Sequence, residues 1–281
     1  MEAEKIKELV KKEYGTIAKQ CCSSNSKTCC GVGPVCEIDY SIFSEDYSKL
    51  EGYLPSADLS LGCGRPTNYA ELKKGDTVLD LGSGAGNDCF VARAMVGPTG
   101  KVIGLDMTEE MLQKARENVE KTKFNNVEFR MGEIEKMPVI SNTVDTIISN
   151  CVLNLVPDKS KAFAEMFRVL KDGGHFSVSD VVTDGALPEG MQKESSLYCG
   201  CIAGALKLDE YLGMLKKAGF TDIKMQSQKK IELPKEVLLK FLSSKDVDSY
   251  MSSGFGIFSV TLYGVKPKVY TGGCNCTFCD K

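Results

Sequence analysis

Short apolar runs alternate with amphipathic segments along most of the chain, from about residue 74 to residue 265. The runs have the length of buried strands, and the segments between them place apolar residues at helical spacing. The predicted strands are residues 77–82, 101–107, 126–132, 175–182, 221–232 and 257–265, and residues 144–155 contain a further one, the fourth along the chain. The predicted helices are residues 88–95, 108–123, 160–170, 208–220 and 235–243, with a turn at 171–174. Because strands alternate with helices, we expect an α/β protein with a doubly wound, mostly parallel, seven-stranded sheet.

The pattern changes on either side of this region and indicates how the chain is organised. An apolar face predicts a further helix at residues 2–19, and the Cys-, Ser- and Gly-rich residues 20–36 show no apolar periodicity. We therefore divide the chain into three parts. They are an N-terminal helix, Cys-rich loop and cap (1–70), a core (71–232), and a C-terminal extension (233–281) that completes the sheet and ends in a Cys-rich tail.

Composition adds an unusual feature, because the 281 residues include 13 cysteines and a single histidine. The net charge of -3 gives no general electrostatic reason to bind nucleic acid or an anionic membrane. The N-terminus lacks a signal-peptide core, and no run of about 18 apolar residues occurs. We expect a cytoplasmic protein with reduced thiols, and such proteins use many cysteines mostly for metal, metalloid or redox chemistry.

A glycine-rich turn follows the first predicted strand and precedes a helix. It contains Gly82, Gly84 and Gly86, which allow a tight turn and close approach of a ligand to the backbone. Asp106 ends the second strand, where a carboxylate reaches a ribose hydroxyl, and Asp80 is placed to meet an ammonium group. The spacing is one residue shorter than the dinucleotide fingerprint. The segment therefore predicts a ligand with a ribose and an amine but no pyrophosphate; the alternative is a turn with no ligand.

The same segments resemble the class I S-adenosylmethionine-dependent methyltransferases. The similarity lies in VLDLGSGAGND, VIGLDMTEEML, FRMGEIEKMP and the run from VDTIISN to HFSVSD, over roughly residues 74–182. The resemblance implies a Rossmann-like methyltransferase sheet and S-adenosylmethionine as cofactor. It implies a cofactor site made by Asp80, Gly82, Gly84, Gly86, Asp106, Met107, Glu133, Ile134 and Asn150.

Three cysteines are predicted to lie near the carboxyl edge of the sheet. Cys151 follows the fourth strand, Cys201 lies shortly after the fifth, and Cys63 lies in the cap just before the first strand. A single cysteine in such a place is more often a small buried hydrophobe than a ligand. Three of them around one cleft favour a binding role, because ligands of open α/β sheets bind at this edge.

These cysteines lie in segments that resemble a narrower family, the arsenite methyltransferases. The matching pieces are LGCGRPT, LGSGAGNDCF, LDMTEEML, GEIE, ISNCVLNL and YCGCIAGAL, over residues 61–206. The resemblance implies that Cys151 and Cys201 bind As(III), that Cys63 is a third thiol, and that an N-terminal cysteine is their disulfide partner. Cys36 is the best match for that partner, with Cys29 and Cys30 as alternatives. It further implies arsenic detoxification, with arsenite or its thiol conjugate as substrate and a thiol such as thioredoxin or glutathione as reductant.

The chemistry is consistent with the scarcity of histidine. Soft thiolates suit a thiophilic centre, and three of them leave the arsenic lone pair free to attack the sulfonium methyl group. Because arsenic carries no proton to remove, no general base is needed, and we interpret His175 as an ordinary turn or surface histidine.

Several alternatives remain open at this point. The clusters Cys21, Cys22, Cys29, Cys30 and Cys274, Cys276, Cys279 suit arsenic capture, redox exchange, a zinc site or no catalytic role. Cys89 and Cys199 are interpreted as packing or bystander thiols. The rival functions are a class I methyltransferase for a small organic substrate and a thiol-rich protein that binds soft metals.

Overall fold

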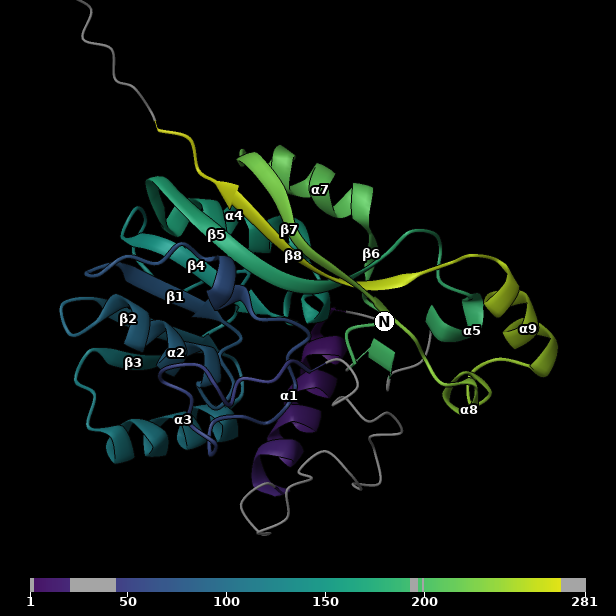
Figure 1. Ribbon diagram of the computed structural model, residues 1–281, viewed down its shortest axis with the longest axis horizontal. Helices are drawn as coiled ribbons and strands as arrows, with labels where there is room; N and C mark the ends of the chain where they lie inside the picture. Colours follow the sequence, from purple (N-terminus) through teal and green to yellow (C-terminus); the bar gives the residue numbers. More distant parts are fainter. Residues whose placement is uncertain (1–2, 21–43, 193–196, 199, 269–281) are drawn as a thin grey trace, which may run out of the picture.

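One mixed sheet organises the molecule. The computed structural model describes residues 3–20, 44–192, 197–198 and 200–268. The sheet has the order β3-β2-β1-β4-β5-β8-β7, with the short β6 paired to β5 (Figure 1). Its strands are β1 (Thr77–Leu81), β2 (Lys101–Asp106), β3 (Val127–Met131), β4 (Val144–Asn150), β5 (Leu170–Thr183), β6 (Leu206–Lys207), β7 (Thr221–Ile231) and β8 (Ile257–Val265). All the pairings are parallel except those of β8, which is antiparallel to β5 and β7.

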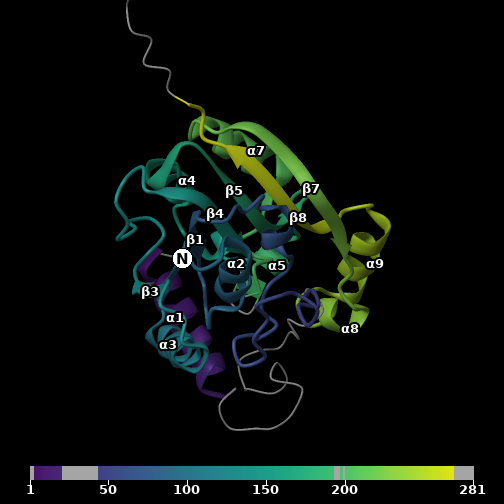
Figure 2. The ribbon, with the colours of Figure 1, turned by 60° about the vertical axis from the view of Figure 1, so that its left-hand side comes forward.

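Helices flank the sheet, and two of them lie beyond one end of it. They are α1 (Ala3–Gln20), α2 (Asn87–Val96), α3 (Glu109–Thr122), α4 (Lys159–Val169), α5 (Glu189–Gln192), α7 (Leu208–Lys217), α8 (Lys235–Leu238) and α9 (Ser244–Ser252), with 3-10 turns η2 (Pro66–Tyr69) and η3 (Leu153–Leu155). The N-terminal α1 packs beside α3 in both views, and α8 and α9 lie together beyond the end of β7 (Figures 1 and 2).

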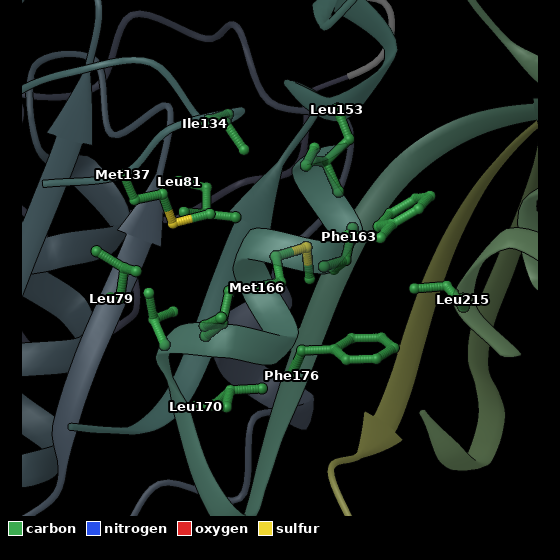
Figure 3. Close-up of a cluster of buried hydrophobic side chains, with 14 of the residues drawn as sticks. Leu79, Leu81, Ile134, Met137, Leu153, Phe163, Met166, Leu170, Phe176 and Leu215 are labelled. Atoms are coloured by element: carbon green, nitrogen blue, oxygen red, sulfur yellow. The ribbon is translucent and has the colours of Figure 1, made fainter. Parts of the chain in front are cut away.

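The alternation of side chains along the strands separates two cores. Leu79 and Ile147 belong to the larger core, which packs against α4 and α7 through Phe163, Met166 and Leu215 (Figure 3). Their neighbours along the strands, Val78 and Ile148, point to the other face and pack with α2 residues such as Ala92 and Val96. This period of two is what a sheet covered on both faces requires.

The predicted α/β class and all seven strands are confirmed, with corrections at several boundaries. The two-residue β6 is an eighth strand. The predicted turn at 171–174 lies inside β5, where the pairing with β4 shifts register and Gly173 has φ +82°. The strand predicted within residues 144–155 is β4, which ends at Asn150 just before Cys151, and η3 follows. The predicted helix at 235–243 is only the short α8, and α9 was not predicted. β8 of the C-terminal extension lies between two strands of the core.

Candidate functional site

A cleft opens at the carboxyl ends of β1, β2 and β4. It encloses about 1170 Å³ including its open mouth. The glycine-rich turn forms its floor, the cap contributes residues 57–62, and α1 closes one side with Lys7, Val10 and Tyr14. The cleft therefore lies where open α/β sheets bind their ligands.

The glycine-rich turn places its backbone directly against the cleft. Gly82 and Gly84 have φ of +65° and +52°, a conformation that favours glycine. A Cβ on Gly82 would lie 2.4 Å from Val152, whereas one on Gly84 would meet only the Met111 sulfur at 3.9 Å. Gly82 is therefore required for packing, and the open space beside Gly84 leaves room for a ligand.

Carboxyl groups dominate the charge of the cleft. The lining carries six of them, Glu45, Asp58, Asp80, Asp88, Asp106 and Glu135, and among the described lining residues Lys7 is the single Lys or Arg. Burial and the neighbouring Asp88 hold the pKa of Asp80 well above its usual value, and burial raises the pKa of Asp88 to about 6. Burial also raises the pKa of Asp106. A cationic ligand would compensate this concentration of carboxyl groups.

The residues present fit S-adenosylmethionine, which carries a sulfonium, an ammonium group and a ribose. Asp106 Oδ2 accepts the Gly84 N–H at 2.9 Å and Oδ1 accepts the Thr108 N–H at 2.8 Å, which fixes the carboxylate at the end of β2, where a ribose hydroxyl can reach it. Ser83 Oγ and Asn87 Oδ1 are buried at the cleft without a hydrogen-bond partner among the described residues. These two polar atoms are therefore available to hydrogen-bond a ligand bound in the cleft.

The other predicted cofactor residues are distributed unevenly. Met107, Ile134 and Asn150 line the cleft together with Asp80, Gly82, Gly84 and Asp106. Gly86 lies behind the turn, where a Cβ would lie 2.7 Å from Phe129. Glu133 does not line the cleft; it forms ion pairs with Lys7 at 2.7 Å and Lys11 at 3.6 Å, and so holds α1.

The structure brings Cys63, Cys151 and Cys201 together beside this cleft. All three are free and buried, with exposed fractions of 1%, 7% and 2%. The Cys151 thiol lies close to both other thiols, and the Cys201 thiol donates to the Cys151 carbonyl at 2.8 Å. They belong to one apolar cluster with residues of α1, the cap and the C-terminal part. Cys151 alone of the three lines the cofactor cleft.

The surroundings of Cys151 and Cys201 raise the pKa values of both thiols. Hydrogen bonds with Cys201 and Cys63, together with burial, hold the pKa of Cys151 well above its usual value. For Cys201, the hydrogen bond with Cys151 lowers the pKa, but burial and the charge of Asp180 outweigh it and the net shift is upward. Cys151 and Cys201 are therefore neutral thiols at neutral pH.

Two of these cysteines have an unusual backbone. Cys151 has φ +60° and Cys201 has φ +62°, in the left-handed region that few residues other than glycine adopt. Such conformations cost about 1–3 kcal/mol each and cluster at functional sites. The two thiols that were expected to bind arsenic are therefore held in a strained conformation by their surroundings.

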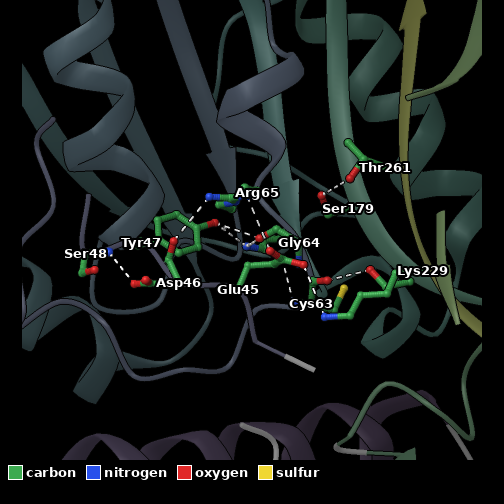
Figure 4. Close-up of polar contacts among 12 residues, drawn as sticks. Glu45, Asp46, Tyr47, Ser48, Cys63, Gly64, Arg65, Ser179, Lys229 and Thr261 are labelled. Atoms are coloured by element: carbon green, nitrogen blue, oxygen red, sulfur yellow. Dashed lines mark hydrogen bonds and ion pairs between the residues drawn. The ribbon is translucent and has the colours of Figure 1, made fainter. Parts of the chain in front are cut away.

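Cys63 is placed by contacts that sequence patterns did not reveal. Tyr47, Asp88 and Asn150 form a buried network beneath the Cys63 loop. Tyr47 Oη donates to the Gly64 carbonyl at 2.9 Å (Figure 4) and also lies 2.9 Å from Asp88 Oδ1, and Asn150 donates to Asp88 at 3.0 Å. Ser259 of β8 donates to the Cys63 carbonyl at 2.6 Å. The sequence signal for this placement of Cys63 is the glycine on either side of it. At Gly62 the close packing requires glycine, because a Cβ there would lie 2.4 Å from the Asn150 amide.

Other candidate groups contribute less. Among the described residues, no set of three or more His, Cys, Asp or Glu side chains is arranged to hold a metal ion, so the three thiols are neighbours rather than a preassembled metal site. Cys89 packs in the core and donates to Asp80 at 3.2 Å. His175 Nε2 bonds the Ala70 carbonyl at 2.6 Å at the opposite end of β4 and β5, which is a structural role. The predicted Cys36 and the two terminal clusters lie outside the described residues, as does Cys199.

Comparison with known proteins assigns the class. The model of the family described as "Methyltransferase domain" matches residues 72–219. A solved structure with a TM-score of 0.62 is an arsenic (III) S-adenosylmethionine methyltransferase from Chlamydomonas reinhardtii, 33% identical over 75% of this chain and 68% of that one. Together with the acidic, glycine-lined cleft, these matches define an S-adenosylmethionine-dependent methyltransferase.

Curated relatives narrow the class to a family. The arsenite methyltransferase of Halobacterium salinarum is 40% identical over 94% of this chain and 67% of its own length. That of Aquipseudomonas alcaligenes is 31% identical over 92% of this chain and 73% of its own length. This chain belongs to the arsenite methyltransferase family. Among the described residues, no helix is long and apolar enough to cross a membrane.

Proposed function

We propose that this protein transfers methyl groups from S-adenosylmethionine to trivalent arsenic bound by Cys63, Cys151 and Cys201, as a step in arsenic detoxification. The position of Cys151 carries the proposal, because this residue lines the cofactor cleft and its thiol lies close to the other two. One residue thus connects the cleft to the buried cluster that holds the three thiols. Thiol ligands suit a soft, thiophilic centre such as As(III).

Neutral thiols suit the binding step. Arsenite, As(OH)3, condenses with three thiols to form three As–S bonds and releases three molecules of water. The thiol protons leave in that water, so no thiolate has to accumulate and no net charge is buried. The raised pKa values of Cys151 and Cys201 are therefore compatible with binding an uncharged substrate. Binding would draw the three neighbouring sulfurs around one arsenic atom.

Methyl transfer then requires little proton chemistry. When bound, S-adenosylmethionine would supply an electrophilic methyl group on a sulfonium centre, whose S–CH3 bond would break with its electron pair left on sulfur as a neutral thioether. Arsenic held by three thiolates retains one lone pair, which forms the As–C bond without loss of a proton. The chain contributes proximity and orientation through Cys151 and the acidic cleft. No general base is needed, in agreement with the structural contacts of His175.

Turnover requires a reductant. Methylation raises arsenic formally from As(III) to As(V), and a pair of protein thiols returns it to As(III) by forming a disulfide. An external thiol such as glutathione or thioredoxin would then reduce that disulfide. We retain Cys36 as the partner that the family pattern suggests, with Cys29 and Cys30 as alternatives.

Transfer of a labelled methyl group, assayed with arsenite, antimonite or no acceptor, tests the proposal. We expect arsenite-dependent transfer that is lost in Cys151→Ser and Cys201→Ser while S-adenosylmethionine binding remains. His175→Gln is the control variant and should retain transfer, because His175 lies at the other end of the sheet. Transfer that survives loss of both thiols would favour a small organic substrate. Arsenite binding without any transfer would favour a soft-metal-binding protein.

A further inference from the structure

We infer that Asn150 and Asn154 are positioning residues that hold Cys63 and Cys201 on either side of Cys151 for the binding of trivalent arsenic. The inference rests on the proposed function and deepens it, because it identifies what sets the spacing of the three thiols. The two asparagines flank Cys151 within the segment NCVLN, and each contacts the backbone of a different cysteine loop.

Asn150 holds the Cys63 loop through both ends of its amide. Its Oδ1 accepts the N–H groups of Cys63 at 3.0 Å and Gly64 at 3.2 Å, and its Nδ2 donates to the Gly64 carbonyl at 2.8 Å. A Cβ on Gly62 would lie 2.4 Å from Nδ2, so the loop lies directly on the amide. This contact joins the cap to the carboxyl end of β4 and fixes where Cys63 enters the cluster.

The same amide has little capacity left for a cofactor. Its Nδ2 also lies 3.0 Å from Asp88 Oδ2 and 3.0 Å from Tyr47 Oη, so three acceptors share two N–H bonds. The sequence pattern placed Asn150 in the cofactor site, and the residue does line the cleft. Its hydrogen bonds nevertheless point to the Cys63 loop and to the wall of the cleft.

Asn154 makes the corresponding contact with Cys201. Its side chain is fully buried, and Nδ2 donates to the Val181 carbonyl at 2.6 Å and to the Cys201 carbonyl at 3.3 Å. Lys159 donates to the Asn154 carbonyl at 3.2 Å and so anchors the backbone of the segment. The contact bridges β5 to Cys201, whose left-handed backbone at φ +62° needs external support.

One short segment therefore determines the arrangement of all three thiols. Cys151 supplies the central thiol, and its N–H is fixed to β5 by a 2.8 Å bond to the Ser179 carbonyl. Asn150 holds the cap cysteine and Asn154 holds the cysteine that follows β5. Residues that support metal ligands in this way typically change affinity about 10–100-fold when they are removed.

Two double-mutant cycles test the inference through arsenite affinity. Asn150→Ala should weaken arsenite binding about 10–100-fold in the wild-type background but cause no further loss in Cys63→Ser. Asn154→Ala should behave in the same way with respect to Cys201→Ser. When Asn150→Ala is instead added to Cys201→Ser, arsenite affinity should still fall, because Cys63 still binds arsenic in that background. If Asn150→Ala does not fold, Asn150→Asp carries the same cycle, since it keeps the acceptor for Cys63 and loses the donor to Gly64.

Phenylarsine oxide gives a second readout, because it forms bonds with two thiols rather than three. Asn150→Ala should keep its affinity for phenylarsine oxide through Cys151 and Cys201 while losing affinity for arsenite. Asn126→Ala is a matched control, because the Asn126 amide also joins two loops, through the Gly97 and Gly100 carbonyls at 3.0 and 2.8 Å, away from the thiols. This control should leave both affinities unchanged.

The outcomes separate the inference from the proposed function. Equal losses in the wild-type and Cys63→Ser backgrounds would overturn the inference, since Asn150 would then act on the fold. A fall in S-adenosylmethionine affinity as large as the fall for arsenite would overturn it as well, and would restore Asn150 to the cofactor site. If Cys63→Ser itself left arsenite affinity unchanged, the three-thiol site of the proposed function would fail, and the role of Asn150 would fail with it.

Discussion

The cofactor cleft and the thiol cluster meet at Cys151, yet the cleft is acidic and the cluster is neutral. The cleft is partly open and lined by six carboxyl groups. The thiol cluster is closed and apolar, and the thiols of Cys151 and Cys201 are neutral. A cleft with this charge suits a cationic methyl donor, and a neutral cluster of thiols suits an uncharged acceptor. The contrast agrees with the proposed function, in which the two reactants bind on either side of Cys151.

The two regions also differ in how they are assembled along the chain. The glycine turn and the acidic residues at the ends of β1 and β2 lie within residues 80–108. The thiols come from three segments that meet only in the folded molecule, with supporting contacts from α1 and β8. A substitution that affects one region and spares the other therefore tests whether the two sites are separate.

The largest expected effect is that of Cys151→Ser. A hydroxyl is a poor ligand for As(III), so we expect arsenite affinity to fall more than about 100-fold, beyond the range of supporting residues. S-adenosylmethionine affinity should stay nearly unchanged, because the acidic side chains of the cleft are intact. Binding measurements with each ligand check the prediction, and a parallel loss of both affinities would show that the two regions form a single site.

Asp106→Asn is the reciprocal change in the cleft. It keeps the shape of the side chain but removes the charge from the group expected to accept the ribose hydroxyls. Hydrogen bonds to charged groups contribute about 1.5–3 kcal/mol, so S-adenosylmethionine affinity should fall at least about tenfold. Arsenite affinity, measured without cofactor, should not change. A cofactor affinity equal to that of the wild type would remove Asp106 from the site.

The pH dependence of cofactor binding should reflect Asp88. Burial raises its pKa to about 6, although hydrogen bonds from Asn150 and Tyr47 oppose the rise. The carboxyl is neutral below that pH and negative above it, so affinity for the cationic cofactor should increase between pH 5 and 7. Calorimetric titrations at pH 5, 6 and 7 check this, and Asp88→Asn should flatten the profile. An unchanged profile in the variant would assign the titration to another carboxyl.

The same shift predicts the sign of the effect on stability without ligand. The pKa of Asp88 is 3.8 in the unfolded reference and about 6 in the fold, so folding favours the protonated form. The stabilisation is complete below pH 3.8 and is lost as the pH rises through about 6. Asp88→Asn should therefore lose less stability than the wild type between pH 4 and 7 in denaturant titrations.

The smallest predicted effect concerns the strained backbone of Cys201. At φ +62°, glycine is relaxed and alanine keeps the strain. Cys201→Gly should therefore be more stable than Cys201→Ala by about 1 kcal/mol, the reverse of the order expected in a helix or strand. Urea unfolding of the two variants checks the difference. A more stable alanine variant would mean that the left-handed conformation is not retained.

Much of the fold could be predicted from sequence because it depends on local periodicity. The alternation of apolar residues in β1, β2 and β4 and the glycine-rich turn are local signals, and the structure confirms them. The turn expected at 171–174 is instead an irregular part of β5: the register with β4 skips these residues, and the Gly173 N–H bonds the Lys266 carbonyl, a contact far away in the sequence. The short β6 and the break between α8 and α9 have no strong periodic signal.

The candidate site was predictable where a motif is contiguous and less so where tertiary contacts decide. Asp106 and Gly84 lie as expected, whereas Glu133 pairs with Lys7 of α1, and no local pattern indicates that pairing. The roles of Tyr47 and Asp88 depend on the fold of the cap over β4. The binding of arsenic by Cys63, Cys151 and Cys201 stays a prediction, now supported by their proximity.

Arsenic X-ray absorption on the protein loaded with arsenite identifies the atoms bound to arsenic. We expect three sulfur neighbours and no oxygen around arsenic in the wild type, and two sulfur neighbours in Cys63→Ser. Three sulfur neighbours in both proteins, or oxygen neighbours in the wild type, would contradict a site formed by Cys63, Cys151 and Cys201.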